Sequence, residues 1–217
     1  MSNRKPTGHN GKMIKTEEAH PGYYFRTWSI PASPDTCPNA GRCKHGCYAG
    51  TGRMGCPTAQ NAYAENLIMI EDGTFEERIS EEIATEAAKA ARGGKQLRIR
   101  IHDTGDFFSE EYLDTWIRVM QRFPEVRFYA YTKMVSLVSS KVLPANLRIV
   151  YSYGGKEDAL LDTIRDVAKA AVIGESAPLP LGYADGSHDD FWASEGMSVA
   201  IRYHGPKSRA WTAGPKE

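Results

Sequence analysis

Segments with the composition of β-strands alternate with segments of helical periodicity along most of the chain, and this alternation constrains the fold more than any other feature. Strands are expected where β-branched and aromatic residues gather between turn residues. Alternating strands and helices favour a mostly parallel sheet with right-handed crossovers. The strands are expected at about residues 23–30, 96–102, 126–132, 147–153, 170–174 and 197–203.

The segments between these strands carry apolar residues at helical spacing, with clear starts and stops. Pro57 opens one helix that Asp72 and Gly73 end, and Ser109 is placed to cap another. Because six strands are too few for a complete eight-stranded barrel, we expect an α/β protein with an open, partial TIM-like barrel, a doubly wound sheet being the alternative. Both arrangements place functional loops at the carboxyl ends of the strands. The helices are expected at about residues 57–71, 75–92, 109–122, 134–143 and 160–168.

Composition and charge narrow the class of protein. The chain has 217 residues, 41% of them hydrophobic, which suffices for one domain, expected at residues 21–217. Residues 1–20 lack periodicity and are expected to form a flexible basic arm. Basic and acidic residues are equal at 27 each, so there is no strong nucleic-acid signal. No apolar run reaches the roughly 20 residues that span a bilayer, and no secretory signal is present, so we expect a cytoplasmic protein with no membrane partner.

All four cysteines, Cys37, Cys43, Cys47 and Cys56, fall within a Gly- and Pro-rich stretch after the first expected strand. In a reducing compartment such a group favours metal binding over disulfides. The spacing C-x5-C-x3-C-x8-C contains only one gap of the length that zinc knuckles use. A flexible loop with several glycines suits the larger 4Fe–4S cluster. We therefore expect these residues to bind one 4Fe–4S cluster, with zinc, or redox cysteines without metal, as alternatives.

Charged residues also follow the second and third expected strands. His102, Asp103 and Asp106 come directly after the second strand, and Lys133 comes directly after the third. Because parallel strands bring their carboxyl ends to one edge, we expect His102, Asp103 and Asp106 to form a catalytic pocket on the same face as the cysteine loop. The alternative is structural, with the two aspartates capping turns and His102 packed in the core. An inward-pointing Arg100 would need a carboxylate or a bound anion.

These segments together resemble a family of bacteriophage proteins, the gene product 88-like family. The resemblance covers about residues 22–155 and implies a protein that works in the cytoplasm of the host cell. It implies no particular reaction. The residues that carry it are the cysteine loop, R-x-H-D-x-G-D-F-F-S-x-E-Y-x-x-x-W from Arg100 to Trp116, and F-Y-A-Y-T-K from Phe128 to Lys133.

The chain also resembles, at a distance, the radical SAM enzymes, in which a partial barrel holds a 4Fe–4S cluster in the loop after the first strand. That resemblance implies that Thr104, Gly105 and Asp106 would grip the amino group of S-adenosylmethionine. Lys133 is a further candidate for cofactor binding at the same edge. The spacing departs from the C-x3-C-x2-C of those enzymes, and a fourth thiolate from Cys56 would close the cluster. S-adenosylmethionine is therefore a possible ligand but not the favoured one.

Three functions are open on this basis. The favoured one is an iron–sulfur protein with a redox or electron-transfer role, served by a redox partner or a small molecule that the sequence does not identify. The others are a zinc-stapled, non-catalytic interaction protein and a radical-type enzyme with an open iron site. Whether the chain is an enzyme depends on Cys56, because an open iron exists only if this cysteine is not a ligand.

Overall fold

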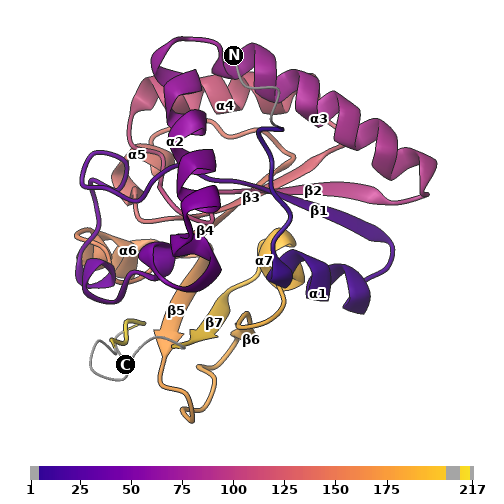
Figure 1. Ribbon diagram of the computed structural model, residues 1–217. Helices are drawn as coiled ribbons and strands as arrows, with labels where there is room; N and C mark the ends of the chain where they lie inside the picture. Colours follow the sequence, from indigo (N-terminus) through magenta and orange to yellow (C-terminus); the bar gives the residue numbers. More distant parts are fainter. Residues whose placement is uncertain (1–4, 204–210, 216–217) are drawn as a thin grey trace.

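The computed structural model describes residues 5–203 and 211–215. All strands pair in parallel in a single seven-stranded sheet of order β1-β2-β3-β4-β5-β7-β6. The sheet curls into an open half-barrel, as expected, with the short β6 as an additional strand in the long loop after β5 (Figure 1). The strands are β1 (Tyr23–Trp28), β2 (Gln96–Ile101), β3 (Arg127–Thr132), β4 (Leu147–Ser152), β5 (Ala168–Ile173), β6 (Ala184–Asp185) and β7 (Val199–Arg202).

Two of the helices begin at residues that favour a helix N-terminus. Pro57 occupies the first turn of α2, and the Ser109 side chain accepts a hydrogen bond from the Tyr112 N–H at 3.2 Å to cap α4. The helix expected up to residue 168 ends earlier, at Thr163, and Asp166 has a φ of +56°, which lies outside the helical range, before β5 begins at Ala168. The helices are α1 (Gly11–Ala19), α2 (Pro57–Glu71), α3 (Phe75–Arg92), α4 (Glu110–Arg122), α5 (Val135–Ser139), α6 (Asp158–Thr163) and α7 (Phe191–Ser194).

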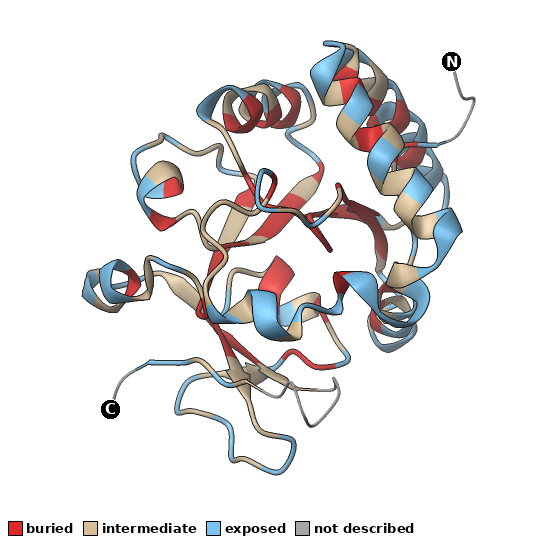
Figure 2. Cartoon of the chain, turned by 60° about the vertical axis from the view of Figure 1, so that its left-hand side comes forward, coloured by how far each residue is buried: buried red, intermediate tan, exposed pale blue. Residues whose placement is uncertain are grey.

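The two faces of the sheet carry different side chains, since successive residues of a strand point to opposite faces. The convex face packs under α3 and α4, and its main core includes Leu97, Ile99 and Ile101 of β2. Figure 2 shows the buried residues concentrated in the strands and on the inner sides of the helices. The concave face is covered by α1 and α7, on the other side of the sheet (Figure 1). Its smaller cluster comprises Met13, Phe25, Tyr129, Val150, Ala170, Ala193 and Val199.

The N-terminal segment differs from the flexible arm expected at residues 1–20, of which residues 1–4 lie outside the described part. Gly8 and Thr27 exchange two backbone hydrogen bonds, at 2.7 and 3.0 Å, along the outer edge of β1. Asn10 then caps α1. The sequence pattern missed α1 because only Met13 and Thr16 of this nine-residue helix are buried, too few to produce an apolar periodicity.

Candidate functional site

The cysteine loop, residues 31–57, lies across the carboxyl ends of three neighbouring strands. At the end of β2, the Thr36 carbonyl accepts a hydrogen bond from the Asp106 N–H at 2.9 Å. At the end of β3, the Asn39 side-chain amide donates to the Lys133 carbonyl at 3.3 Å. The parallel topology therefore brings the loop after β1 and the loop after β2 together, which is the proximity that the strand order implies.

The turn after β2 requires a glycine where it meets the start of the cysteine loop. Gly105 has a φ of +86°, and a β-carbon there would lie 2.2 Å from Cγ1 of Ile30. Next to it, the Thr104 hydroxyl donates to the Ile30 carbonyl at 2.6 Å, and the Thr104 carbonyl accepts from the Ile30 N–H at 3.2 Å. Thr104 and Gly105 thus hold Ile30, the residue directly before the cysteine loop, and this contact accounts for both residue types.

The end of β4 holds the loop mainly through backbone contacts, to which the Lys156 ammonium adds a hydrogen bond to the Pro38 carbonyl at 2.6 Å. The Gly154 carbonyl accepts hydrogen bonds from the N–H groups of Gly41 and Cys43, both at 3.2 Å. A β-carbon on Gly41 would lie only 2.7 Å from the carbonyl of Gly155, so a larger residue would not fit. The N–H groups of Gly154 and Gly155 in turn donate hydrogen bonds to the Asp158 carboxylate. Gly154 and Gly155 therefore support the cysteine loop at the end of β4.

Cys37 lies close enough to charged residues at the strand ends to feel their charge. Burial raises the pKa of its thiol to about 11, and the negative charges of Asp106, Cys47 and Cys43 act in the same direction, while Lys133 opposes them. These electrostatic contacts place Cys37, Cys43 and Cys47 in one neighbourhood with a carboxylate and an ammonium group. Cys56 instead precedes α2, and its charge contributes to the raised pKa of Tyr63.

All four thiols are free, with Cys37 and Cys43 half-buried and Cys47 and Cys56 exposed. Thr36 and Ala49 are the only fully buried residues of the loop, so apolar packing does little to hold it. Within the described ranges, no three His, Cys, Asp or Glu side chains are arranged so that they could hold a metal ion. Four free thiols are nevertheless suitable ligands for a thiolate-bound group. Enclosing such a group would require the exposed half of the loop to move.

Asp106 is buried and ties the ends of β2 and β3 together. One carboxylate oxygen accepts from the Thr132 hydroxyl at 2.6 Å and from the Phe107 N–H at 2.8 Å, and the other accepts from the Lys133 N–H at 2.9 Å. Burial raises the pKa of Asp106, and these hydrogen bonds and the Lys133 charge oppose that shift. The Lys133 ammonium itself donates to the Ser152 hydroxyl at 3.0 Å. The carboxylate therefore has a structural task at the edge where Cys37 lies.

Asp103 points to the concave face. Its carboxylate contacts the Arg100 guanidinium at 3.2 Å and accepts from the Asn10 side-chain amide at 2.5 Å. Its carbonyl accepts from the hydroxyl of Tyr48, a cysteine-loop residue, at 2.6 Å. Tyr48 as a whole is about half exposed, and its phenol is protonated at neutral pH, so it can donate this hydrogen bond. Asp103 therefore links the cysteine loop to the interior of the half-barrel.

His102 points the other way, into the convex core, with a φ of +69°. The Trp28 indole donates to the Tyr112 oxygen at 2.9 Å, and the Tyr112 hydroxyl shares a second hydrogen bond with His102 Nε2, also at 2.9 Å. The other ring nitrogen, Nδ1, has no hydrogen-bond partner among the described residues. Burial, with a contribution from Arg100, lowers the pKa of His102 to about 3. His102, Asp103 and Asp106 therefore occupy three environments instead of one shared pocket.

Comparison with known proteins places the chain in a family. The family model described as Gene product 88 matches residues 2–212. The chain belongs to the Gene product 88 family. The Gene 88 proteins of mycobacteriophages L5 and D29 are 31% and 30% identical to it over 103 residues. These matches cover 46% of this chain and 43% of each relative, so the matched segment spans less than half the length of either phage protein. No solved structure matches the chain.

This Gene product 88 chain also contains a buried charged network that the sequence analysis did not identify. Arg100 points inward, and the carboxylates that it meets are Asp103 and Asp190, the latter at 2.9 Å. Asp190 is fully buried and also accepts from the hydroxyls of Tyr129 and Tyr131 at 3.1 and 3.0 Å. The need for an inward carboxylate was visible in the Arg–Ile alternation of β2, but Asp190 lies 90 positions away from Arg100 in an irregular loop.

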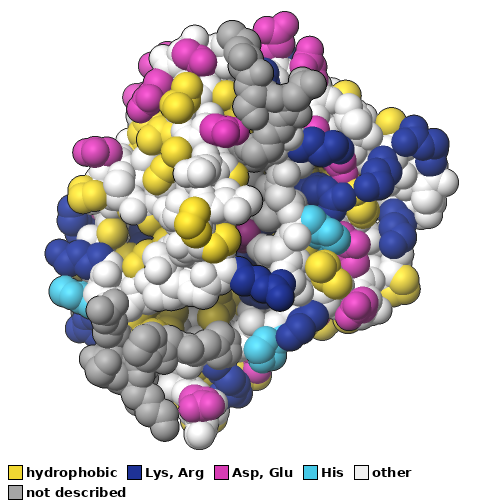
Figure 3. All heavy atoms as spheres, in the orientation of Figure 1, with side chains coloured by type: hydrophobic (Ala, Val, Ile, Leu, Met, Phe, Trp, Pro, Cys, Tyr) yellow, Lys and Arg dark blue, Asp and Glu magenta, His cyan; other side chains and the backbone are white. Residues whose placement is uncertain are grey.

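In the view of Figure 3, acidic side chains gather along the upper left, whereas many of the basic side chains lie on the right, with acidic and histidine side chains among them. The totals over the full sequence are equal, at 27 basic and 27 acidic residues. In the described part of the chain, no helix combines the length and apolar composition needed to cross a membrane.

Proposed function

We propose that the cysteine loop binds one 4Fe–4S cluster through Cys37, Cys43, Cys47 and Cys56, and that the protein has a redox or electron-transfer role. The observation that carries this proposal is the position of the loop across the ends of β2, β3 and β4, with Cys37 beside charged residues. An edge of this kind is where parallel α/β proteins place their functional groups. The cluster would supply one-electron chemistry, and the chain would supply the ligands and the surrounding charge.

The surroundings of the thiols support an iron–sulfur cluster more than zinc. Burial raises the pKa of Cys37 to about 11 and the Lys133 ammonium opposes that shift only in part, so a bound metal would itself have to stabilise the Cys37 thiolate. Arg42, Lys44 and Arg53 are exposed in the same loop and would offset the negative charge of a cluster held by thiolates. Several of the intervening residues are glycines, which suits a chain that must wrap around a larger object than one zinc ion.

A radical-type enzyme with an open iron is the second candidate, and one observation favours it. Cys43 and Cys47 both act on the Cys37 thiol, whereas Cys56 lies at the start of α2, where its charge acts on Tyr63. Three ligands would leave one iron open for a small molecule. Against this, the concave face, where a substrate would lie in a partial barrel, is covered by α1 and α7. We therefore favour four ligands and a closed cluster.

Such a cluster requires a reducing compartment, and we accordingly propose that the protein works in the host cytoplasm with an electron donor or acceptor as its partner. Anaerobic purification followed by iron, sulfide and zinc analysis and by electron paramagnetic resonance of the reduced protein tests the proposal. We expect about four irons and four sulfides per chain, the composition of a cubane cluster. Stoichiometric zinc without iron would overturn the iron–sulfur proposal.

Single Cys→Ser variants then identify the ligands, with Thr51→Ser, a conservative change at an exposed loop position, as the matched control. Loss of the cluster in all four Cys→Ser variants, with full retention in the control, supports four ligands. Retention of the cluster in Cys56→Ser alone would favour the open iron. In that case 5′-deoxyadenosine formation from S-adenosylmethionine by the reduced protein becomes the decisive assay.

A further inference from the structure

Helix α1 covers the concave face mainly through polar contacts. Met13 and Thr16 are its only fully buried residues. At its C-terminal end His20 stacks on Phe191, with ring centroids 4.0 Å apart, and contacts Asp189 at 2.8 Å. A helix of nine residues is not stable alone in water, so these contacts to the rest of the protein keep it in place. Segments with few buried apolar contacts are those that open locally, without global unfolding.

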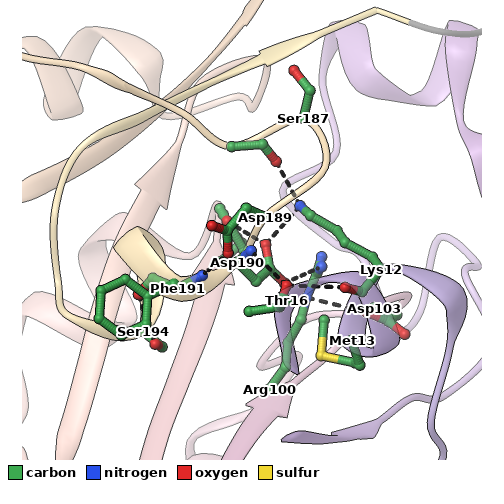
Figure 4. Close-up of polar contacts among 12 residues, drawn as sticks. Lys12, Met13, Thr16, Arg100, Asp103, Ser187, Asp189, Asp190, Phe191 and Ser194 are labelled. Atoms are coloured by element: carbon green, nitrogen blue, oxygen red, sulfur yellow. Dashed lines mark hydrogen bonds and ion pairs between the residues drawn. The ribbon is translucent and has the colours of Figure 1, made fainter. Parts of the chain in front are cut away.

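The central contact between α1 and the sheet is the binding of an ammonium group. Figure 4 shows Lys12 reaching from α1 to Asp190. The Lys12 ammonium lies 2.6 Å from one Asp190 oxygen and donates to the Gly186 carbonyl, also at 2.6 Å. Asp190 is fully buried. Burial opposes its ionisation, but Lys12 and Arg100 outweigh burial and hold the pKa of Asp190 well below its usual value.

The charges of this network determine what could replace Lys12. Lys12 and Arg100 are paired with Asp103 and Asp190, so two positive charges balance two negative ones. Departure of Lys12 would leave one uncompensated carboxylate in a buried position, which is strongly unfavourable. Two oxygen acceptors would also be left facing the vacated position, and a group with several N–H donors satisfies both.

We propose that α1 is a lid that opens independently of the sheet, and that the position of the Lys12 ammonium is a binding site for a ligand that carries a primary ammonium group. In the closed form Lys12 occupies this site and so competes with the ligand. Opening of the lid exposes Asp190, Tyr129 and Tyr131 on the concave face. A ligand with an ammonium group restores the charge balance and holds the lid open.

Amide hydrogen exchange on the unmodified protein tests the lid. The amides of α1 are expected to exchange at least a hundredfold faster than those of β2 and β3, and at a rate that depends only weakly on denaturant. Equal rates and equal denaturant dependence in α1 and the two strands would mean that α1 opens only on global unfolding, and would overturn the proposal.

A pair of variants tests the contact that keeps the lid closed. Lys12→Ala should speed exchange in α1 at least tenfold without changing β2, because the central ionic contact is lost. Lys15→Ala is the matched control, since Lys15 is an exposed residue of the same helix. An equal effect of the two variants would contradict the assignment of Lys12. If Lys12→Ala does not fold, the experiment on the unmodified protein still decides whether α1 is a lid.

Ethylammonium chloride serves as the probe for the ligand site, again with the unmodified protein. It should accelerate exchange in α1 in a saturable manner by competing with Lys12 for Asp190. Tetramethylammonium chloride at the same concentration has the same charge but no N–H donor, and it should have no such effect. Equal responses to the two salts, or no response to ethylammonium, would overturn the ammonium site.

Discussion

Gly41 lies so close to Gly155 that a β-carbon on Gly41 would come within 2.7 Å of the Gly155 carbonyl carbon and oxygen. The same approach allows the backbone of the cysteine loop to donate to the Gly154 carbonyl. A contact between two backbones has no flexible side chain that could yield. The position of the cysteine loop at the sheet edge therefore depends on the absence of a side chain at residue 41.

Gly41→Ala is expected to lower the free energy of unfolding by about 1–3 kcal/mol, the usual cost of an added methyl group in a closely packed site. It should also increase proteolysis within residues 31–57, because the loop can no longer lie against β4. Gly50→Ala is the matched control, since a β-carbon at that position of the same loop meets nothing within 4 Å. Urea unfolding and limited proteolysis measure both effects. Equal behaviour of the two variants would show that the close approach of Gly41 to Gly155 does not hold the loop in place.

Asp106→Asn should destabilise the protein by about 1–3 kcal/mol, because an amide cannot accept all three hydrogen bonds that the buried carboxylate accepts. Asp114→Asn, at a partly exposed carboxylate that pairs with Lys141, should cost less than about 1 kcal/mol. Urea unfolding of the two variants under identical conditions makes the comparison. A similar small loss in both would show that Asp106 does not tie the strand ends together.

His102 should make the protein less stable as the pH falls. The unfolded chain takes up a proton near pH 6.5, whereas the buried ring has a pKa of about 3, so protons favour the unfolded state between these values. The contribution is at most about 1.4 kcal/mol per pH unit. His102→Asn should flatten this dependence, since asparagine tolerates the positive φ. Urea unfolding between pH 7 and pH 4 provides the slopes, and identical slopes would refute a buried, neutral His102.

The thiol of Cys37 should react slowly in the metal-free protein. A pKa of about 11, against an ordinary 9.0, reduces its thiolate fraction at pH 8 about a hundredfold. Alkylation with iodoacetamide, followed by mass spectrometry of the peptides, should therefore label Cys37 well after the exposed Cys47. Equal labelling rates would show that Cys37 is not in the buried environment described.

Much of the sheet could be predicted because each long strand combines β-branched or aromatic residues with flanking turn residues. The strands from β1 to β5 and β7 lie within a few residues of their expected positions. The short elements escaped prediction for physical reasons. α7 has four residues and β6 has two, which are too few to show periodicity, and they depend on contacts made by the completed fold.

The candidate site was predictable in part for the same reason. Parallel topology alone brings the cysteine loop to the turn that contains Asp106. It does not determine where each side chain of that turn points, and the positive φ angles of His102 and Gly105 send neighbouring residues to different faces. Nor could the pairing of Lys12 with Asp190 be inferred, because the two residues lie near opposite ends of the chain and pair only when the half-barrel is complete.

The pairing of Gly8 with Thr27 also bears on how the molecule remains separate from its own copies. An unclosed barrel has two outer strands, and each can template the addition of a strand from another molecule. Gly8 forms an antiparallel bridge with Thr27, so some of the backbone groups on the outer edge of β1 already have hydrogen-bond partners within the chain. Removal of the first ten residues would leave these backbone groups of β1 unpaired, and a strand from a neighbouring molecule could then pair with them.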